Sequence, residues 1–283
     1  MDTALKRIRD CDGKTLVLSW LDLTQLPESL PETLERLDCS FNQLTSLPEH
    51  LPESLKYLYC SENRLTQLPE SLPNGLTKLG CSKNQLTHLP EHLPESLRDL
   101  GCSHNRLTQL PEHLPEGLHV LSCSRNRLTQ LPASLPESLK ELHCFQNQLT
   151  QLPASLPEGL KELHCFQNRL TQLPDHLPGS LRGLVCYYNQ LTQVPALPET
   201  LHVLSCSYNQ LTHLPEPLPK TLKRMNCSHN QLTRLPIHMH KPLVHLVCDH
   251  NPFGAMPHSA QTYRKVCKFR EMYMAGKIQY WYK

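Results

Sequence analysis

Cysteine is the chemically versatile residue that recurs most regularly in this sequence. Of 13 cysteines, eleven follow one another at intervals of 21 residues, with one interval of 20. Such thiols can pack as small apolar side chains, form disulfides or bind metal ions. No CxxC pair occurs, and eleven equivalent thiols cannot all pair, so we expect apolar core residues in a reducing compartment, with scattered disulfides and metal binding as alternatives. The eleven are Cys39, Cys60, Cys81, Cys102, Cys123, Cys144, Cys165, Cys186, Cys206, Cys227 and Cys248.

The remaining candidates for chemistry are weaker. His143 and His164 each open the sequence HCFQN, and two equivalent imidazoles could hold a metal ion. We see no cysteine or carboxylate ligand beside them, so we do not expect a metal there. No Ser/His/Asp set, phosphate-binding loop or carboxylate pair stands out from the variable positions. We therefore expect no enzymatic activity and no cofactor.

The cysteines belong to a 21-residue repeat whose copies make up most of the chain. The copy at residues 34–54 reads LERLDCSFNQLTSLPEHLPES, and each copy begins LxxLxCxxNxL and continues LPxxLP. The alternation predicts a short strand, such as the segment from Glu141 to Phe145. There Leu142 and Cys144 would face the interior, while His143 and Phe145 would face solvent. Because one coil cannot bury its own leucines, the coils must stack.

Two other recurrent residues predict the shape of a coil. An asparagine recurs from Asn42 to Asn251 where the chain leaves the strand, and its amide can pair backbone groups of its own and the adjoining coil. Most of the 25 prolines fall in the Leu-Pro pairs, which excludes a long helix there. We expect an extended, polyproline-like outer side and a modestly curved solenoid.

The residues at the outward strand positions differ from copy to copy, whereas the leucines, cysteines, asparagines and prolines of the repeat recur. Repeat proteins carry their binding specificity on a variable surface of this kind. Serine is the usual residue after the strand cysteine, but three consecutive coils have an aromatic residue there. We predict an exposed aromatic patch that binds a partner. The alternative is that residues 139–159 and 160–180 are recent duplicates with inherited ring packing. The predicted patch comprises His143, Phe145, His164, Phe166, Val185, Tyr187, Tyr188 and Tyr208.

The regularity of the copies divides the chain into three parts. Residues 1–33 are predicted to be an N-terminal cap with a short helix and a degenerate first repeat. Residues 34–257 hold eleven copies of the repeat. Residues 258–283 are predicted to form a helical cap followed by a basic, aromatic tail. Such a tail could contact acidic lipid or nucleic acid, but we favour the simpler interpretation of a C-terminal cap with a solvated face.

Charge and hydropathy limit the partners. The net charge is +2, which is typical neither of a nucleic-acid-binding protein nor of an acidic one. The N-terminus lacks the apolar segment of a signal peptide, and no apolar run is long enough to span a bilayer. We therefore expect a cytoplasmic location. Lysine and arginine gather near the predicted strands, so a mildly positive face would speed association with an acidic protein partner.

The repeat LPESLxxLxCSxNQLTxLP resembles the LPX subclass of bacterial leucine-rich repeats, which includes secreted effectors of the YopM and IpaH kinds. The resemblance covers about residues 13–257. It implies an α/β-type solenoid dominated by β structure: a right-handed superhelix with short parallel strands on one face and few helices except in the caps. It also implies a non-catalytic scaffold that binds a partner protein, as a host-directed effector does.

Some relatives carry a C-terminal ubiquitin-ligase domain with a catalytic cysteine. Only residues 258–283 follow the repeats here, and neither Cys11 nor Cys267 lies in a matching motif. We expect the ligase-free kind of scaffold. The alternative is a ligase-type effector fragment, or the substrate-recognition module of a ubiquitin ligase that lacks its catalytic domain.

Overall fold

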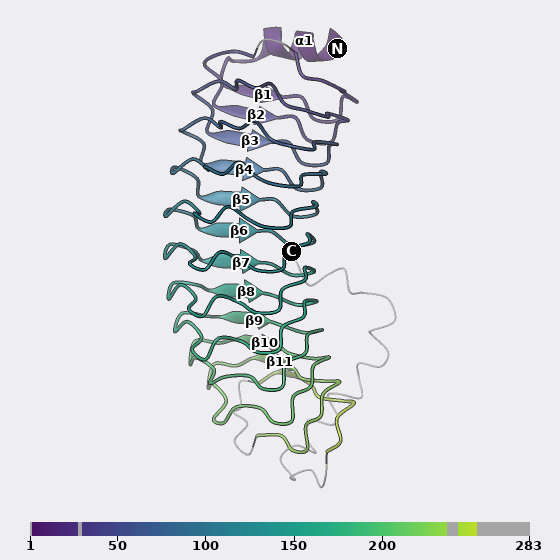
Figure 1. Cartoon of the computed structure of the whole chain (residues 1–283), viewed down its shortest axis with the longest axis vertical. Helices are drawn as coiled ribbons and strands as arrows, with labels where there is room; N and C mark the ends of the chain where they lie inside the picture. The colour runs from purple at the N-terminus through teal and green to yellow at the C-terminus, as the bar shows by residue number, and fades with distance from the viewer. Residues whose placement is uncertain (1, 28–29, 237–242, 254–283) are drawn as a thin grey trace.

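The protein is a stack of coils that each contribute one short strand to a single parallel sheet (Figure 1). The computed structural model describes residues 2–27, 30–236 and 243–253. The helix and tail predicted for residues 258–283 lie outside these residues. In chain order the elements are α1 (Asp2–Asp10), β1 (Thr15–Val17), β2 (Arg36–Asp38), β3 (Tyr57–Tyr59), β4 (Lys78–Gly80), β5 (Asp99–Gly101), β6 (Val120–Ser122), β7 (Glu141–His143), β8 (Glu162–His164), β9 (Gly183–Val185), β10 (Val203–Ser205), β11 (Arg224–Asn226) and β12 (His245–Val247).

Each strand pairs in parallel with its equivalent in the next coil, so that Leu142 lies beside Leu163 and His143 beside His164. The strands are shorter than the predicted segment from Glu141 to Phe145. The backbone N–H of Cys144 still bonds to His164 O at 2.9 Å, but Gln146 then takes a left-handed conformation with φ 53°. That turn ends the strand and repeats in every coil.

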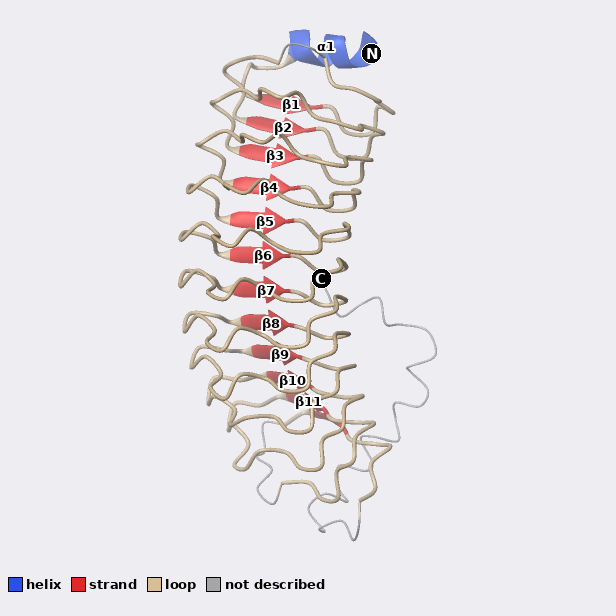
Figure 2. Ribbon diagram, in the orientation of Figure 1, coloured by secondary structure: helices blue, strands red, loops and turns tan. Residues whose placement is uncertain are grey.

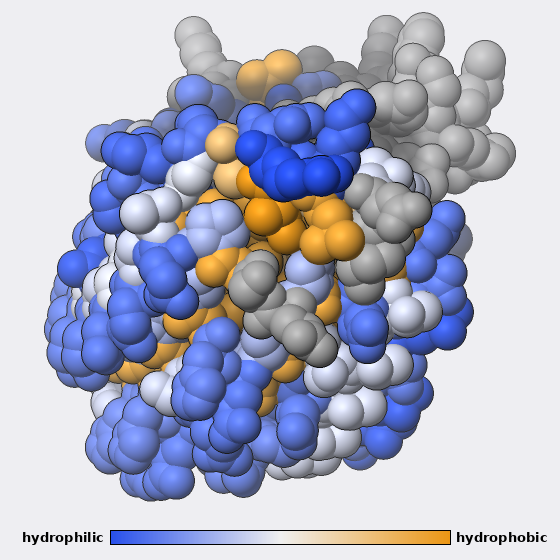
Figure 3. Space-filling model, turned by 90° about the horizontal axis from the view of Figure 1, so that it is seen from above, coloured by the Kyte–Doolittle hydropathy of each residue, from blue (hydrophilic) through white to orange (hydrophobic). Residues whose placement is uncertain are grey.

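Leucine and cysteine fill the interior, as the alternation predicts. Leu142 and Cys144 are fully buried, and the equivalent residues of the other described coils form one continuous core. Figure 3, viewed along the stack, shows apolar residues at its centre and polar residues around them. The eleven repeat cysteines are buried, and burial raises the pKa of Cys102 and Cys165 to about 12. They therefore act as apolar core residues.

A row of asparagines ties each coil to its neighbour. Asn126 Nδ2 donates to Cys123 O and to Cys102 O in the preceding coil, both at 3.0 Å, and also to Ser124 O at 3.3 Å. Its Oδ1 accepts from Leu107 N at 3.0 Å. One side chain thus pairs backbone groups of two coils, which confirms the predicted role of the asparagine.

The outer side of the coils is irregular chain (Figure 2). A turn closes each regular coil; in one, Leu139 N donates to Pro136 O at 2.9 Å. Helix α1 lies across the first coil, with Ala4 fully buried and Ile8 packed on the core, so it caps the N-terminal end. Within the described residues, no helix has the length and apolar character needed to cross a membrane.

Replacing Asn126 with alanine tests the asparagine row. The substitution leaves Leu107 N and two cysteine carbonyls without this partner, and a buried unpaired group costs roughly 1–3 kcal/mol. We expect the free energy of unfolding in urea to fall by at least that amount. Thr129→Ala, on an exposed residue of the same coil, should change it by less than about 0.5 kcal/mol. Equal effects of the two substitutions would contradict the role of the asparagine.

Thiol labelling tests the burial of the cysteines. In the native protein, iodoacetamide should modify partly exposed Cys11 and leave the eleven repeat cysteines untouched, because the reactive thiolate is disfavoured by burial. In denaturant all of them should react. Mass spectrometry of tryptic peptides counts the modified sites, and rapid native labelling of Cys102 or Cys165 would show that the core is open.

Candidate functional site

The outward side chains of the predicted patch form stacks of rings, because equivalent residues of neighbouring coils lie in register. The first ladder consists of Phe145, Phe166 and Tyr187. The centroids of Phe145 and Phe166 are 4.3 Å apart, and those of Phe166 and Tyr187 are 4.4 Å apart, with interplanar angles of 8° and 14°. Parallel strands are spaced by about 4.8 Å, which suits offset stacking of aromatic rings.

A second ladder occupies the turn position directly before the asparagine. It consists of Tyr188, Tyr208, His229 and His250, whose successive ring centroids are 4.1, 4.0 and 4.0 Å apart. All four residues have positive φ, between 51° and 54°. A left-handed backbone is uncommon for residues other than glycine, and most of all for bulky ones such as tyrosine. Here it is held by the hydrogen bonds of the turn, so the side chains start from fixed positions.

The two ladders meet at Tyr187 and Tyr188, whose rings contact edge to face with centroids 5.7 Å apart and an interplanar angle of 69°. Together they form a continuous band, which we call the aromatic strip: Phe145, Phe166, Tyr187, Tyr188, Tyr208, His229 and His250. The sequence analysis predicted the first five of these residues and missed both histidines. The sequence could have identified the two histidines, because His229 and His250 occupy the same position of the repeat as Tyr188 and Tyr208.

The expected exposure of the patch is wrong for part of it. Phe166 is 6% exposed and Val185 is 8% exposed, because neighbours cover both sides of each. Tyr188 and Tyr208 are 46% and 39% exposed. The hydroxyl of Ser124, in the coil before Phe145, is buried and has no hydrogen-bond partner in the described chain. The tyrosines of the second ladder therefore form the accessible part of the strip.

His143 and His164 stack with centroids 4.6 Å apart, beside the first ladder. His143 Nε2 lies 4.0 Å from Glu141 Oε2, and His164 Nε2 lies 3.6 Å from Glu162 Oε2. The expectation that no carboxylate lies near these histidines is therefore wrong. Burial, followed by the neighbouring His164, lowers the pKa of His143 to about 4. His143 is neutral at neutral pH, so this pair serves mainly as packing.

Ion pairs balance part of the basic charge near the strands. Glu35 contacts Lys56 at 2.9 Å and Lys14 at 3.3 Å, and Lys78 contacts Asp99 at 2.5 Å. All three pairs lie before the aromatic strip in the chain. In the coils that carry Phe166 and Tyr187, Lys161 and Arg182 precede the strands and are exposed. Basic side chains thus remain exposed in the same coils as the rings of the strip.

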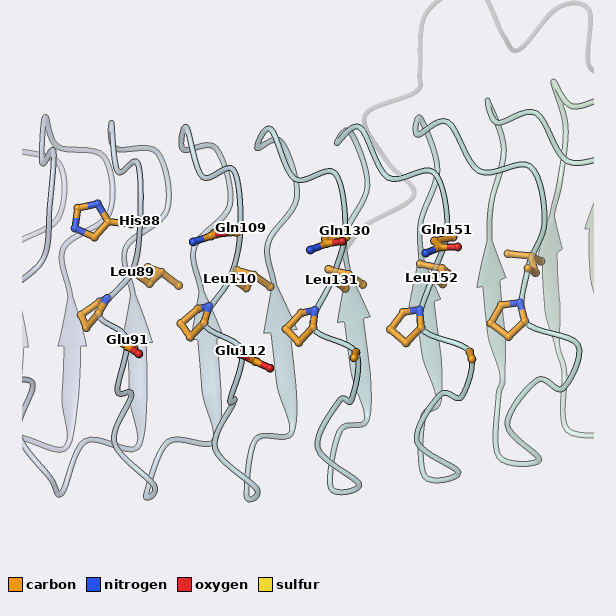
Figure 4. Close-up of a pocket in the computed structure, with 18 of the residues that line it drawn as sticks. His88, Leu89, Glu91, Gln109, Leu110, Glu112, Gln130, Leu131, Gln151 and Leu152 are labelled. Atoms are coloured by element: carbon orange, nitrogen blue, oxygen red, sulfur yellow. The ribbon is translucent and has the colours of Figure 1, made fainter.

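A groove runs along the Leu-Pro segments, away from the strip (Figure 4). Figure 4 shows its repeated rows: Gln109, Gln130 and Gln151 form one, and Leu110, Leu131 and Leu152 form another. These leucines are already buried in the core. The side chains that the groove exposes to a partner are mainly glutamines, glutamates and alanines, so it is a weaker candidate than the strip.

Comparisons with known proteins agree with this architecture. The leucine-rich repeat family model matches residues 33–53 and 54–74. YopM, a leucine-rich effector protein from Yersinia pestis, is 32% identical over 91% of this chain and 90% of its own, with a TM-score of 0.57. The chain belongs to the leucine-rich repeat family. Its repeats are of the bacterial-effector type.

Two further structures match this leucine-rich repeat protein. The functional domain of InlJ from Listeria monocytogenes, which includes a cysteine ladder, is 27% identical over 86% of this chain and 55% of its own, with a TM-score of 0.79. The repeat domain of FLRT2, solved in a complex with latrophilin 3 and Unc5D, is 25% identical over 78% of this chain and 83% of its own, with a TM-score of 0.60. No curated protein matches the sequence significantly.

The depressed pKa of His143 predicts a pH-dependent stability. Unfolded histidine titrates near 6.5, so as pH falls from about 6.5 to 4 the unfolded chain binds a proton that the folded chain does not. The free energy of unfolding should be unaffected by this group above pH 7 and lowered by roughly 2 kcal/mol at pH 5. Urea titrations at pH 7.5 and pH 5 measure the difference, which should shrink in His143→Gln. His113→Gln, on an exposed outer residue, should keep the wild-type difference.

Proposed function

We propose that this protein is a non-catalytic scaffold that binds a partner protein on its strand face, with the aromatic strip as the main contact. The observation that supports the proposal most directly is the continuous strip with two exposed tyrosines at its centre. Tyrosine is enriched at binding hot spots because it combines a large apolar area with a hydroxyl. Leucine-rich repeat domains commonly bind proteins, and the FLRT2 repeat domain was solved in such a complex.

The strip also supports a binding role over inherited packing. Duplication of the coils at residues 139–159 and 160–180 would account for Phe145 and Phe166, which share the sequence HCFQN. It would not account for Tyr208, which follows CS rather than CF, or for the second ladder as a whole. In addition, the unpaired hydroxyl of Ser124 is a cost to stability next to the first ladder. Packing alone is therefore an incomplete explanation.

We propose that the protein acts in a reducing compartment. Buried repeat cysteines such as Cys102 and Cys165, which form no disulfide in the described part of the chain, suit a reducing compartment such as the cytosol. The similarity to YopM, an effector, is consistent with action on a host protein. Exposed Lys161 and Arg182, in the coils that carry Phe166 and Tyr187, would favour an acidic partner by speeding the encounter.

Serine substitutions in both ladders test the proposal. We expect Tyr188→Ser with Tyr208→Ser, and separately Phe145→Ser with Phe166→Ser and Tyr187→Ser, to abolish capture of the protein partner from host-cell lysate. The measurement is quantitative mass spectrometry of captured proteins, followed by calorimetry with the purified partner. Circular dichroism and the unfolding midpoint show whether each variant is folded.

The matched control is the pair Trp20→Ser and Phe41→Ser. These rings also stack in the turn position, with centroids 4.1 Å apart, but they lie at the N-terminal end of the stack. The control should retain every captured protein. Capture that survives in the folded tyrosine variant, or that is lost equally in the control, would place the binding surface elsewhere.

A further inference from the structure

The C-terminal end of the aromatic strip brings two imidazoles and a carboxylate together. His229 belongs to the coil of β11, and Asp249 and His250 belong to the coil of β12. One potential ligand atom from each residue lies within 4.8 Å of those of the other two. The imidazoles stack with centroids 4.0 Å apart, and His250 Nδ1 lies 2.6 Å from Asp249 Oδ2.

The backbone holds these three residues in place. His229 N donates to Asp249 O at 3.0 Å, across the two coils. Asn251 Nδ2 also donates to Asp249 O, at 3.2 Å, and its Oδ1 accepts from Leu232 N at 3.0 Å. The left-handed turns at His229 and His250, with φ of 51° and 54°, direct both side chains from the same face. The backbone of all three residues is thus held in place, while the rings can still turn.

We propose that His229, Asp249 and His250 bind a divalent transition-metal ion, with Zn²⁺ the best match. Two imidazoles and one carboxylate form a common ligand set for such ions, at distances near 2.0–2.2 Å for Zn²⁺. Three protein ligands leave at least one coordination position for water or for a side chain of a bound partner. The site would thus give the exposed end of the strip a directional contact that aromatic rings cannot supply.

The affinity is limited by the ring stack. An imidazole nitrogen binds a metal in the plane of its ring, and the planes of His229 and His250 differ by only 9°. Both rings must turn about the Cβ–Cγ bond so that their nitrogens converge on one ion. Binding therefore replaces the stack, and we expect a dissociation constant in the micromolar range, not the tight binding of a structural zinc site.

His104 occupies the same turn position of its coil but lacks a neighbouring histidine and aspartate. Its Nε2 lies 2.7 Å from Arg125 Nη1, and Lys83 precedes it in the same column. Two cationic neighbours repel a metal ion, so His104 is the matched control for the proposed site.

Calorimetric titration of the full chain with ZnCl₂ at pH 7.5 tests the proposal. We expect His229→Gln and His250→Gln each to weaken Zn²⁺ binding at least tenfold, Asp249→Asn to weaken it less, and His104→Gln to leave it unchanged. Titration with Co²⁺ should give a visible spectrum without the thiolate charge-transfer band, which excludes the cysteines as ligands. Asp249→Asn keeps both rings, so it tests the site even if a histidine substitution disturbs the turn.

Two results would overturn the proposal. The first is wild-type protein that shows no saturable Zn²⁺ binding at submillimolar concentrations. The second is wild-type affinity in folded His229→Gln and His250→Gln, which would assign the ion to other residues. Circular dichroism of each variant establishes that it is folded.

Discussion

The asparagine that follows each strand, whose side-chain amide bonds to the backbone of two coils, is the constraint on which the rest of this protein depends. A solenoid coil has few internal backbone hydrogen bonds, so its buried N–H and C=O groups need partners from outside the coil. Asn126 supplies them to its own coil and the preceding one, and its equivalents do the same along the stack. The amide also stabilises the left-handed turn before it. Small apolar cysteine fits the interior beside it without adding a group that requires a partner.

Strict repetition of that turn places equivalent side chains in columns with the spacing of a parallel sheet. This spacing is close to the distance at which aromatic rings stack, so neighbouring aromatic residues in one column necessarily contact each other. The stacking has two effects that a single exposed ring does not have. It buries the middle ring, Phe166, and it holds the accessible rings, Tyr188 and Tyr208, in defined orientations. A partner would therefore meet a surface that loses little side-chain freedom on binding.

The sequence predicts the elements of this fold well because each depends on a local rule that is repeated. Pleating places Leu142 and Cys144 inside, and proline excludes helices from the Leu-Pro segments. The errors have another origin, in contacts between coils. The strand ends at His143 because of the turn at Gln146, Phe166 is buried by rings from two other coils, and Glu162 lies 3.6 Å from His164. His229 and His250 were not predicted, although they occupy the same position of the repeat as Tyr188 and Tyr208.

The path of the strip limits the kind of partner that the proposed binding would allow. The first ladder follows the position after the cysteine and ends at Tyr187, and the second follows the next position and begins at Tyr188 in the same coil. The strip thus shifts by one position midway along its length. A straight segment lying along one column would contact only one ladder. A partner that contacts both must cross the columns obliquely, which favours a folded surface with its own curvature over a single extended peptide. The exposed tyrosines lie at and just beyond the crossing, where such a surface would contact both ladders at once.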